Sequence, residues 1–207
     1  MAIRKEDLAA MPDINRNYTH EEYMNIEYIN ENPRLELIDG QIYFMAAPNR
    51  AHQEVSSNLQ GTIWNFLKGK KCQIFAAPFA VNLEQGKGHD TTVQPDLVVV
   101  CDPNKLDKKG CNGTPDMVIE ILSPSTTRKD RLLKYLKYEQ AGVAEYWIVD
   151  PDGRFVEVYL LQDGRYFSKR YGEEDKIPCD VLEGLEIDLN EIFPPEDKGL
   201  EQEEQHE

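Results

Sequence analysis

The chain has 207 residues, of which 40% are hydrophobic and 9% aromatic, and this composition excludes a wholly disordered protein. No apolar run approaches the roughly 18–20 residues that span a bilayer, and the charged N-terminus lacks the apolar core of a secretory signal. We therefore expect a cytoplasmic protein with no membrane partner. The net charge of −15 opposes nucleic-acid binding at long range, so phosphate contacts would depend on local groups of Lys and Arg.

The four cysteines are far apart in the sequence, at Cys72, Cys101, Cys111 and Cys179. They form no CxxC pair, and no pair of histidines stands near them. This pattern predicts neither a zinc site nor a disulfide framework, and it is typical of a protein in a reducing cytoplasm.

No internal repeat or low-complexity linker divides the chain, so we expect a single domain over residues 18–193. Residues 1–17 would be an N-terminal extension. Residues 194–207 form an acidic tail that we expect to be disordered, and part of the negative charge is segregated there.

The N-terminal half predicts two helices and four strands. Residues 18–30 open with Thr19 followed by Glu22, which is a capping-box signature. The stretch RLELIDGQIYFM indicates a tight hairpin that turns at Asp39-Gly40. Apolar residues at helical spacing predict an amphipathic helix over 51–69, with His52 on or near its buried side. Strands should follow at 73–76 and 79–83.

The C-terminal half predicts buried strands over 94–101, 117–122 and 145–151, with a helix over 125–141 between the last two. That helix would be capped by Ser125 or Thr126. A hairpin turning at Asp163-Gly164 follows. The strand–helix–strand unit needs a crossover and hence a parallel pair of strands, whereas the hairpins are antiparallel. The predicted fold class is α+β with α/β character: a mixed central sheet flanked by helices.

Two carboxylates interrupt the apolar strands, Asp96 in QPDLVVV and Glu120 in VIEIL. Burying an ionised carboxylate without a partner costs several kcal/mol. If the two strands are neighbours, the acids come close and repel each other unless one is protonated or a cation lies between them. Oxygen ligands of this kind suit Mg²⁺ or Mn²⁺. Alternatively, Glu120 forms a buried ion pair with a helix lysine, and Asp96 caps the turn at Pro95.

The strings LELIDGQIYFMAAPNRAHQ, QPDLVVVCD, PDMVIEILSPST and KDRLLKYLKYEQAGVAEYWIVDP resemble the Uma2 family of restriction-endonuclease-like proteins, also known as domain of unknown function 820. The resemblance covers residues 18–193. It implies the fold of the PD-(D/E)XK nuclease superfamily. It also places Pro95-Asp96 at the "PD" and Glu120 at the "(D/E)" of that motif.

The sequence departs from the superfamily pattern at Leu122, where a lysine is expected two residues after the acid. Some superfamily members recruit this lysine from a neighbouring helix. Lys134 is the candidate, because it shares a helical face with Asp130 and Tyr138, and Lys137 is the alternative. The alternative to a catalytic role is that Lys134 forms an ordinary ion pair within the helix.

Further candidates surround the two acids. Glu36 matches a family position and could bind the metal or support its ligands, although a glutamate beside a hairpin turn is also ordinary. His52 could take part in proton transfer or be a partly buried structural histidine. Gln94 could position a water molecule. Phosphate groups could be bound by Lys137 and Arg131.

The sequence thus predicts a Mg²⁺-dependent (or Mn²⁺-dependent) endonuclease that hydrolyses DNA phosphodiester bonds. By analogy with nucleases that cut two strands, we expect a homodimer. The alternative, favoured by the acidic charge and by Leu122, is a non-catalytic binding or regulatory module that keeps the nuclease fold. A hydrolase of small molecules with His52 as its base ranks last, because no nucleophile motif accompanies it.

Overall fold

The computed structural model describes residues 12–29, 35–45, 47–83, 90–123 and 128–195, with the side chains of 27–29 and 128–131 left aside. Helices and strands of both orientations are mixed along the chain, which confirms the predicted α+β class. The helices are α2 (His20–Ile29), α3 (Arg50–Leu67) and α4 (Arg128–Ala141), with 3₁₀ turns η1 (Pro103–Lys105) and η2 (Leu189–Glu191). The strands are β1 (Leu35–Ile38), β2 (Gln41–Phe44), β3 (Gln73–Ala76), β4 (Ala80–Asn82), β5 (Thr92–Val93), β6 (Leu97–Val100), β7 (Gly110–Asn112), β8 (Met117–Ile121), β9 (Glu145–Asp150), β10 (Phe155–Gln162), β11 (Arg165–Gly172), β12 (Lys176–Pro178) and β13 (Glu186–Asp188).

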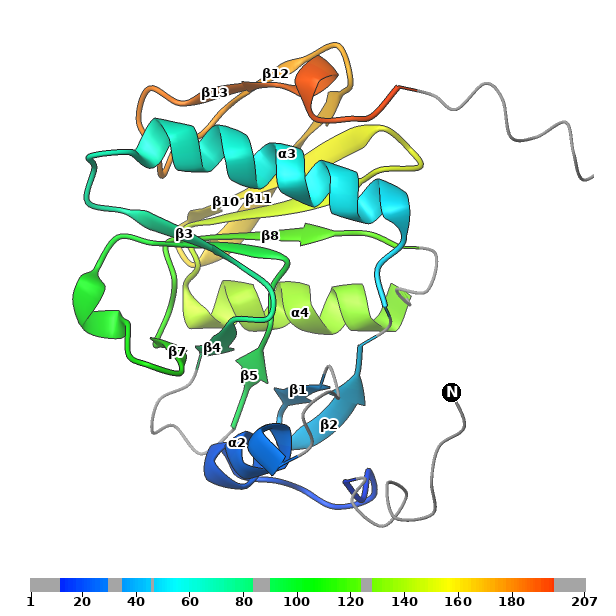
Figure 1. The fold of residues 1–207 in the computed structure, drawn as a ribbon, viewed down its shortest axis with the longest axis vertical. Helices are drawn as coiled ribbons and strands as arrows, with labels where there is room; N and C mark the ends of the chain where they lie inside the picture. The colour runs from blue at the N-terminus through cyan, green and yellow to red at the C-terminus, as the bar shows by residue number, and fades with distance from the viewer. Residues whose placement is uncertain (1–11, 30–34, 46, 84–89, 124–127, 196–207) are drawn as a thin grey trace, which may run out of the picture.

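A six-stranded sheet in the order β11-β10-β9-β8-β6-β3 forms the centre of the molecule, with α3 and α4 on opposite faces (Figure 1). The buried stripe of α3 packs on one face of the sheet, and α4 contributes Tyr138 to the core on the other face. Each fully buried apolar side chain stabilises the fold by roughly 1.5–3 kcal/mol. The α3 stripe consists of Val55, Leu59, Ile63 and Leu67.

The order of strands explains how the two acid-bearing strands meet. Strand β8 pairs with β9 in parallel, as the predicted crossover through α4 requires, and it pairs with β6 antiparallel. The two strands predicted to carry the carboxylates are therefore direct neighbours in the sheet.

A second, five-stranded sheet in the order β2-β1-β5-β4-β7 lies below α4 in Figure 1, with α2 beside it. Its β1–β2 hairpin confirms the predicted turn, since Asp39 and Gly40 have φ angles of 51° and 78°. The predicted capping box at α2 is also confirmed. The Glu22 amide donates to Thr19 Oγ1 at 3.2 Å, and the Thr19 amide donates to Glu22 Oε2 at 2.8 Å.

Several element boundaries differ from the predictions. Helix α3 starts one residue earlier than predicted, because the Asn49 side chain caps it by accepting from the His52 amide. It ends before Gly69, whose φ of 76° is typical of a helix C-terminus. Strands β5, β7, β12 and β13 were not predicted, since two or three residues show no periodicity. The predicted caps of α4, Ser125 and Thr126, lie outside the described residues.

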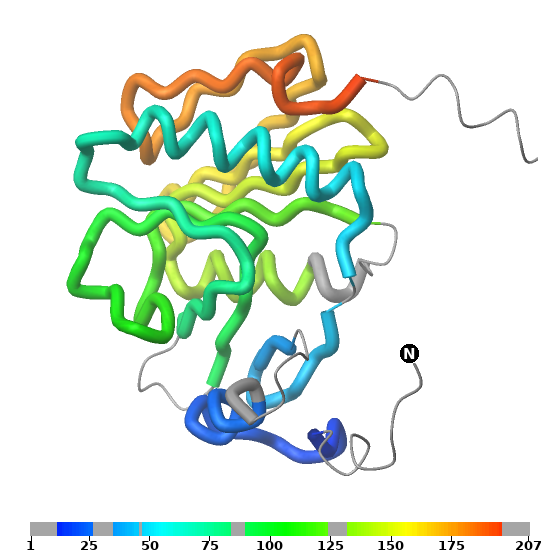
Figure 2. Tube along the Cα trace, viewed as in Figure 1, coloured from blue at the N-terminus to red at the C-terminus, as the bar shows by residue number. Residues whose placement is uncertain are grey.

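The C-terminal segment runs from β12 through β13 to η2 and lies along α3, as the chain trace in Figure 2 shows. The Asn58 side chain of α3 donates to the Ile192 carbonyl at 3.0 Å, which joins the two. Apolar residues of this segment complete the core on the α3 face: Ile177, Cys179, Leu182, Leu185, Ile187, Leu189, Ile192 and Phe193.

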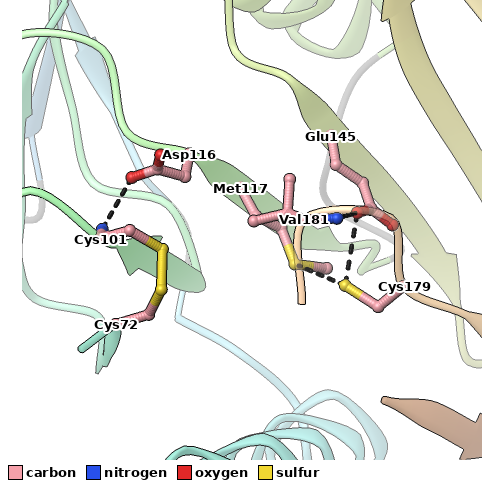
Figure 3. The surroundings of a disulfide bond; sticks show 7 residues. All are labelled: Cys72, Cys101, Asp116, Met117, Glu145, Cys179 and Val181. Atoms are coloured by element: carbon pink, nitrogen blue, oxygen red, sulfur yellow. Dashed lines mark hydrogen bonds between the residues drawn. A yellow bond between two sulfur atoms is a disulfide. The ribbon is translucent and has the colours of Figure 1, made fainter. Parts of the chain in front are cut away.

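The prediction that the cysteines form no disulfide is wrong for Cys72 and Cys101, which are bonded to each other (Figure 3). Strand β3 at the sheet edge pairs with β6, and Gln73 is opposite Val100. The preceding Cys72 and the following Cys101 are therefore brought together by strand pairing, which no spacing in the sequence indicates. The argument from cysteines to a reducing compartment loses its basis.

Replacing Cys72 and Cys101 together by serine should lower the free energy of unfolding by about 2–4 kcal/mol, because the bond closes a loop of 29 residues in the unfolded chain. Urea unfolding of the oxidised protein and the double variant would measure this. In denaturant without reductant, the oxidised protein should react with a thiol reagent at Cys111 and Cys179 alone. Four reactive thiols would contradict the disulfide.

No helix in the described ranges is long and apolar enough to cross a membrane.

A candidate active site between two helices

The centre of the candidate site is formed by two carboxylates on adjacent strands. In the β6–β8 pair, Leu97 is opposite Ile119, and continuing this register by one residue places Asp96 opposite Glu120. The amide of Ile121 donates to Asp96 Oδ2 at 2.7 Å, so the backbone of β8 itself holds the aspartate in place. Both carboxylate side chains keep a small exposed fraction, 14% for Asp96 and 13% for Glu120, so solvent reaches them.

His52, in the first turn of α3, approaches Asp96 from the other side. Its Nε2 lies 3.1 Å from Asp96 Oδ1. Its Nδ1 is buried and has no hydrogen-bond partner in the described part of the chain. Because the Asn49 cap fixes the start of α3, the position of the imidazole beside Asp96 is set by the beginning of the helix.

Helix α4 brings Lys134 and Tyr138 to Glu120. The ammonium of Lys134 lies 3.0 Å from Glu120 Oε1, and the Tyr138 hydroxyl donates to the same oxygen at 2.6 Å. The two residues are one helical turn apart and therefore share a face of α4. The ring of Tyr138 packs against Tyr146 of β9, with centroids 5.0 Å apart, and this packing holds the hydroxyl in place.

Glu36 of β1 completes the site from the second sheet. Its Oε1 lies 2.8 Å from Lys134 Nζ and accepts from the Gln94 amide at 2.8 Å. The side-chain amide of Gln94 donates to the Tyr23 hydroxyl and to the Leu35 carbonyl, each at 3.1 Å. These contacts anchor β1 to the segment that enters β6, so Lys134 lies between a carboxylate from each sheet.

Two carboxylates, Glu36 and Glu120, therefore share one buried lysine, and Asp96 adds a third negative charge nearby. Burial raises the pKa of Glu120 to about 7, and the negative charges of Asp96 and Glu36 act in the same direction while Lys134 opposes them. Burial acts to lower the pKa of Lys134, but the charges of Glu120 and Glu36 outweigh it and hold this pKa above its ordinary value. Lys134 is thus a permanent cation, and the site carries excess negative charge.

The raised pKa of Glu120 predicts how stability depends on pH. The unfolded chain ionises this group near its ordinary value of 4.5, whereas the folded chain does so near 7, so the folded state binds more protons in between. The free energy of unfolding should therefore fall as pH rises from about 4.5 to 7, by about 3 kcal/mol at most. Urea unfolding at both ends of this window would measure it. The Glu120→Gln variant should lack this part of the decline, and an equal decline in both proteins would contradict the assignment.

The structure brings six of the predicted site residues together: Glu36, His52, Gln94, Asp96, Glu120 and Lys134. Lys137 instead contacts Asp39 in the β1–β2 turn, and the side chain of Arg131 lies outside the described residues, so their phosphate-binding roles stay predictions. Gln94 contacts protein groups, and its predicted role in positioning water is untested. Tyr138 was not predicted as a site residue, although its spacing from Lys134 was a usable signal.

The donor chemistry of Asp96 and Glu120 fits Mg²⁺ or Mn²⁺, because such ions commonly take one or two carboxylates and complete their shell with water and substrate phosphate. Burial is the main cause of the raised Glu120 pKa, and a cation beside both acids would offset the repulsion from Asp96 that adds to it. A preformed cage of protein ligands is not present: within the described ranges, no group of three or more His, Cys, Asp or Glu side chains is arranged to hold a metal ion.

The fold, a mixed sheet between two helices, matches that of a nuclease-like protein of known structure. The sequence model of the Uma2 family, described as "Putative restriction endonuclease", matches residues 20–190, and the chain belongs to this family. The crystal structure of a putative nuclease of DUF820 from Anabaena variabilis superposes with a TM-score of 0.68 at 21% identity, covering 85% of this chain and 97% of that one. "Uncharacterized protein slr1290" from Synechocystis sp. (strain ATCC 27184 / PCC 6803 / Kazusa) is 28% identical over 175 residues, which are 84% of this chain and 90% of the relative.

Proposed function

We propose that the protein is a Mg²⁺- or Mn²⁺-dependent endonuclease that hydrolyses phosphodiester bonds of DNA. The observation that carries this proposal is the arrangement of Asp96 and Glu120 on neighbouring strands with Lys134 brought to Glu120 by α4. Leu122 occupies the strand position where the superfamily pattern has a lysine. Lys134, from helix α4, brings an ammonium group to the same carboxylate, Glu120.

In this proposal, Asp96 and Glu120 are the residues that hold the metal. When bound, the ion would polarise the scissile phosphate and lower the pKa of an attacking water molecule. The Ile121 amide and His52 hold Asp96 in position, so the acid is already oriented before substrate arrives.

Lys134 would stabilise the negative charge that develops on the phosphoryl oxygens, because its ammonium stays protonated in a site of little solvent exposure. Glu36 and Tyr138 act through other groups: Glu36 positions Lys134, and Tyr138 positions Glu120. We assign Glu36 this supporting role rather than that of a metal ligand, since both of its described contacts are to hydrogen-bond donors.

The net charge of −15 repels DNA at long range. Local lysines would have to supply the attraction to phosphate, and affinity should fall steeply with salt. A homodimer, which cutting both strands of a duplex favours, is part of the proposal.

The second candidate is a binding or regulatory module with the nuclease fold. One observation favours it: the ammonium of Lys134 contacts the Oε1 atoms of both Glu36 and Glu120, so each of these acids has a cationic partner in the absence of any metal ion. Such a module would have no need of a divalent metal.

Cleavage of supercoiled plasmid and of single-stranded DNA in Mg²⁺ and then in Mn²⁺ tests the proposal. Asp96→Asn and Glu120→Gln should each lower the rate by a hundredfold or more, because a metal ligand supplies several kcal/mol of transition-state stabilisation. Glu186→Gln, an exposed carboxylate on β13, is the matched control and should cleave like the unchanged protein.

Calorimetric titration of Mn²⁺ into the same proteins separates the two candidates. Metal binding that both site variants lose, together with cleavage, would support the endonuclease. Absence of metal binding, or cleavage equal in all variants, would overturn it in favour of the module.

A further inference from the structure

The middle of the sequence contains a stretch whose charge differs from that of the rest of the chain. No Asp or Glu occurs between Glu54 and Glu84, although the protein has 38 acidic residues and a net charge of −15. The charged residues inside this stretch are three lysines, Lys68, Lys70 and Lys71. The stretch covers most of α3, the turn that follows it, and strands β3 and β4.

Helix α3 presents a tryptophan to solvent next to these lysines. Trp64 is 55% exposed, whereas the other tryptophan of the chain, Trp147, is fully buried in β9. The Lys68 ammonium lies 4.2 Å from the centre of the Trp64 ring and donates to the Asn65 side chain at 2.8 Å. An exposed indole flanked by a cation is a platform for flat, electron-rich or anionic ligands.

The end of α3 keeps the remaining lysines beside this platform. The helix stops before Gly69, and the Lys70 amide then donates to the Leu67 carbonyl at 2.9 Å, which folds the turn back onto the helix. The Lys70 ammonium lies 3.0 Å from the centre of the Phe66 ring, and Lys71 is exposed. We call Trp64, Lys68, Lys70 and Lys71 the α3 platform.

The loop across the disulfide does not extend this positive charge. Cys101 leads into a loop over 102–109 that contains η1, and there Lys105, Lys108 and Lys109 are interleaved with Asp102 and Asp107. The Lys105 ammonium also donates a hydrogen bond to the Thr114 carbonyl at 2.6 Å. The lysines of this loop are therefore balanced by acids, whereas those of the α3 platform are not and lie next to an exposed tryptophan.

We propose that the α3 platform binds single-stranded nucleic acid, with an unpaired base stacked on the face of Trp64 that Lys68 does not cover and the adjoining phosphates on Lys68, Lys70 and Lys71. An unpaired base offers its π-face to an aromatic ring, whereas the faces of duplex bases are covered by their neighbours. The three lysines, in a stretch free of acids, supply the complementary charge.

This inference deepens the proposed function and rests on it in one respect, the connection to the cleavage site. Trp64 is 12 residues after His52 on the same helix, or about 18 Å along its axis. A strand cut near Asp96 could thus be held at a second point on α3. Binding at the platform can nevertheless be measured without any cleavage.

The test uses the full chain in EDTA, with labelled oligothymidylate of about 20 nucleotides at about 50 mM salt. Trp64→Ala should weaken binding by about tenfold, the order of one lost base–aromatic stack. Lys68→Met should weaken binding and lower the slope of log affinity against log salt by about 0.7. Lys169→Met is the matched control, because it removes another exposed lysine that lies over an aromatic ring, Tyr171, on β11, and it should bind like the unchanged protein.

Tryptophan fluorescence gives a second readout. The exposed Trp64 should be quenched when oligothymidylate binds and the buried Trp147 should not, so Trp64→Phe should abolish most of the change. Inorganic polyphosphate should bind more weakly and leave the fluorescence unchanged.

Equal affinity of Trp64→Ala and the unchanged protein would overturn the proposal, and so would polyphosphate or duplex DNA binding as tightly as the single strand. Because EDTA prevents metal-dependent cleavage, these outcomes do not depend on whether the protein is a nuclease. Conversely, loss of cleavage in the Asp96 and Glu120 variants with unchanged platform binding would support both proposals separately.

Discussion

Replacing Lys134 by methionine is expected to lower DNA cleavage by about a hundredfold to a thousandfold, the usual effect of removing one group that stabilises transition-state charge. The same change should lower the free energy of unfolding near pH 8 by about 3–5 kcal/mol, because it leaves Glu36 and Glu120 buried without their cation. The loss of stability should shrink toward pH 5, where Glu120 takes up a proton. Plasmid-cleavage rates and urea unfolding at the two pH values would measure these effects.

A second variant separates the chemical role of Lys134 from its structural role. Leu122 follows Glu120 by two residues and lies on the same face of the chain, where the superfamily pattern has its lysine. The double variant Leu122→Lys with Lys134→Met should regain part of the cleavage lost in the single variant. A folded Lys134→Met protein that cleaves at the full rate would show that the lysine has no catalytic role.

Replacing Glu145 by alanine is expected to lower the free energy of unfolding by about 3–5 kcal/mol. Glu145 begins β9 and is fully buried, and its carboxylate accepts from Trp147 Nε1 at 2.7 Å and from the Val181 amide at 2.9 Å. The Cys179 thiol contacts the same carboxylate at 3.3 Å (Figure 3). The alanine variant leaves these donors buried without an acceptor, and each unsatisfied donor costs about 1–3 kcal/mol.

Glu145→Gln is the matched control, because it keeps the size of the side chain and one carbonyl acceptor. It should cost less than half as much as the alanine variant. Thermal and urea unfolding of the three proteins would measure the difference. A loss below about 1 kcal/mol in Glu145→Ala would contradict the view that this carboxylate joins the C-terminal segment to the central sheet.

Local signals in the sequence were enough to predict most elements of the fold. The apolar run around Glu120 in VIEIL, the helical spacing from Val55 to Leu67 and the turn residues Asp39-Gly40 each reflect interactions between residues close in the chain. The structure confirms all three: α3 buries that stripe, β8 is buried on both faces, and Asp39 and Gly40 have positive φ angles. The acids of the site were visible for the same reason, since Asp96 and Glu120 interrupt strands that are otherwise apolar.

Only the tertiary structure decided which residues far apart in the chain contact each other. The bond between Cys72 and Cys101 follows from the register of β3 with β6, and the contacts of Lys134 to Glu36 and Glu120 follow from how α4 lies between two sheets. Glu145 gave no signal, because two of its partners, Cys179 and Val181, belong to a segment whose strands are three residues long. The sequence by itself determined the fold class and the two acids through local periodicity. Strand register and helix docking are set by packing of the whole chain. They determined which groups contact Asp96 and Glu120.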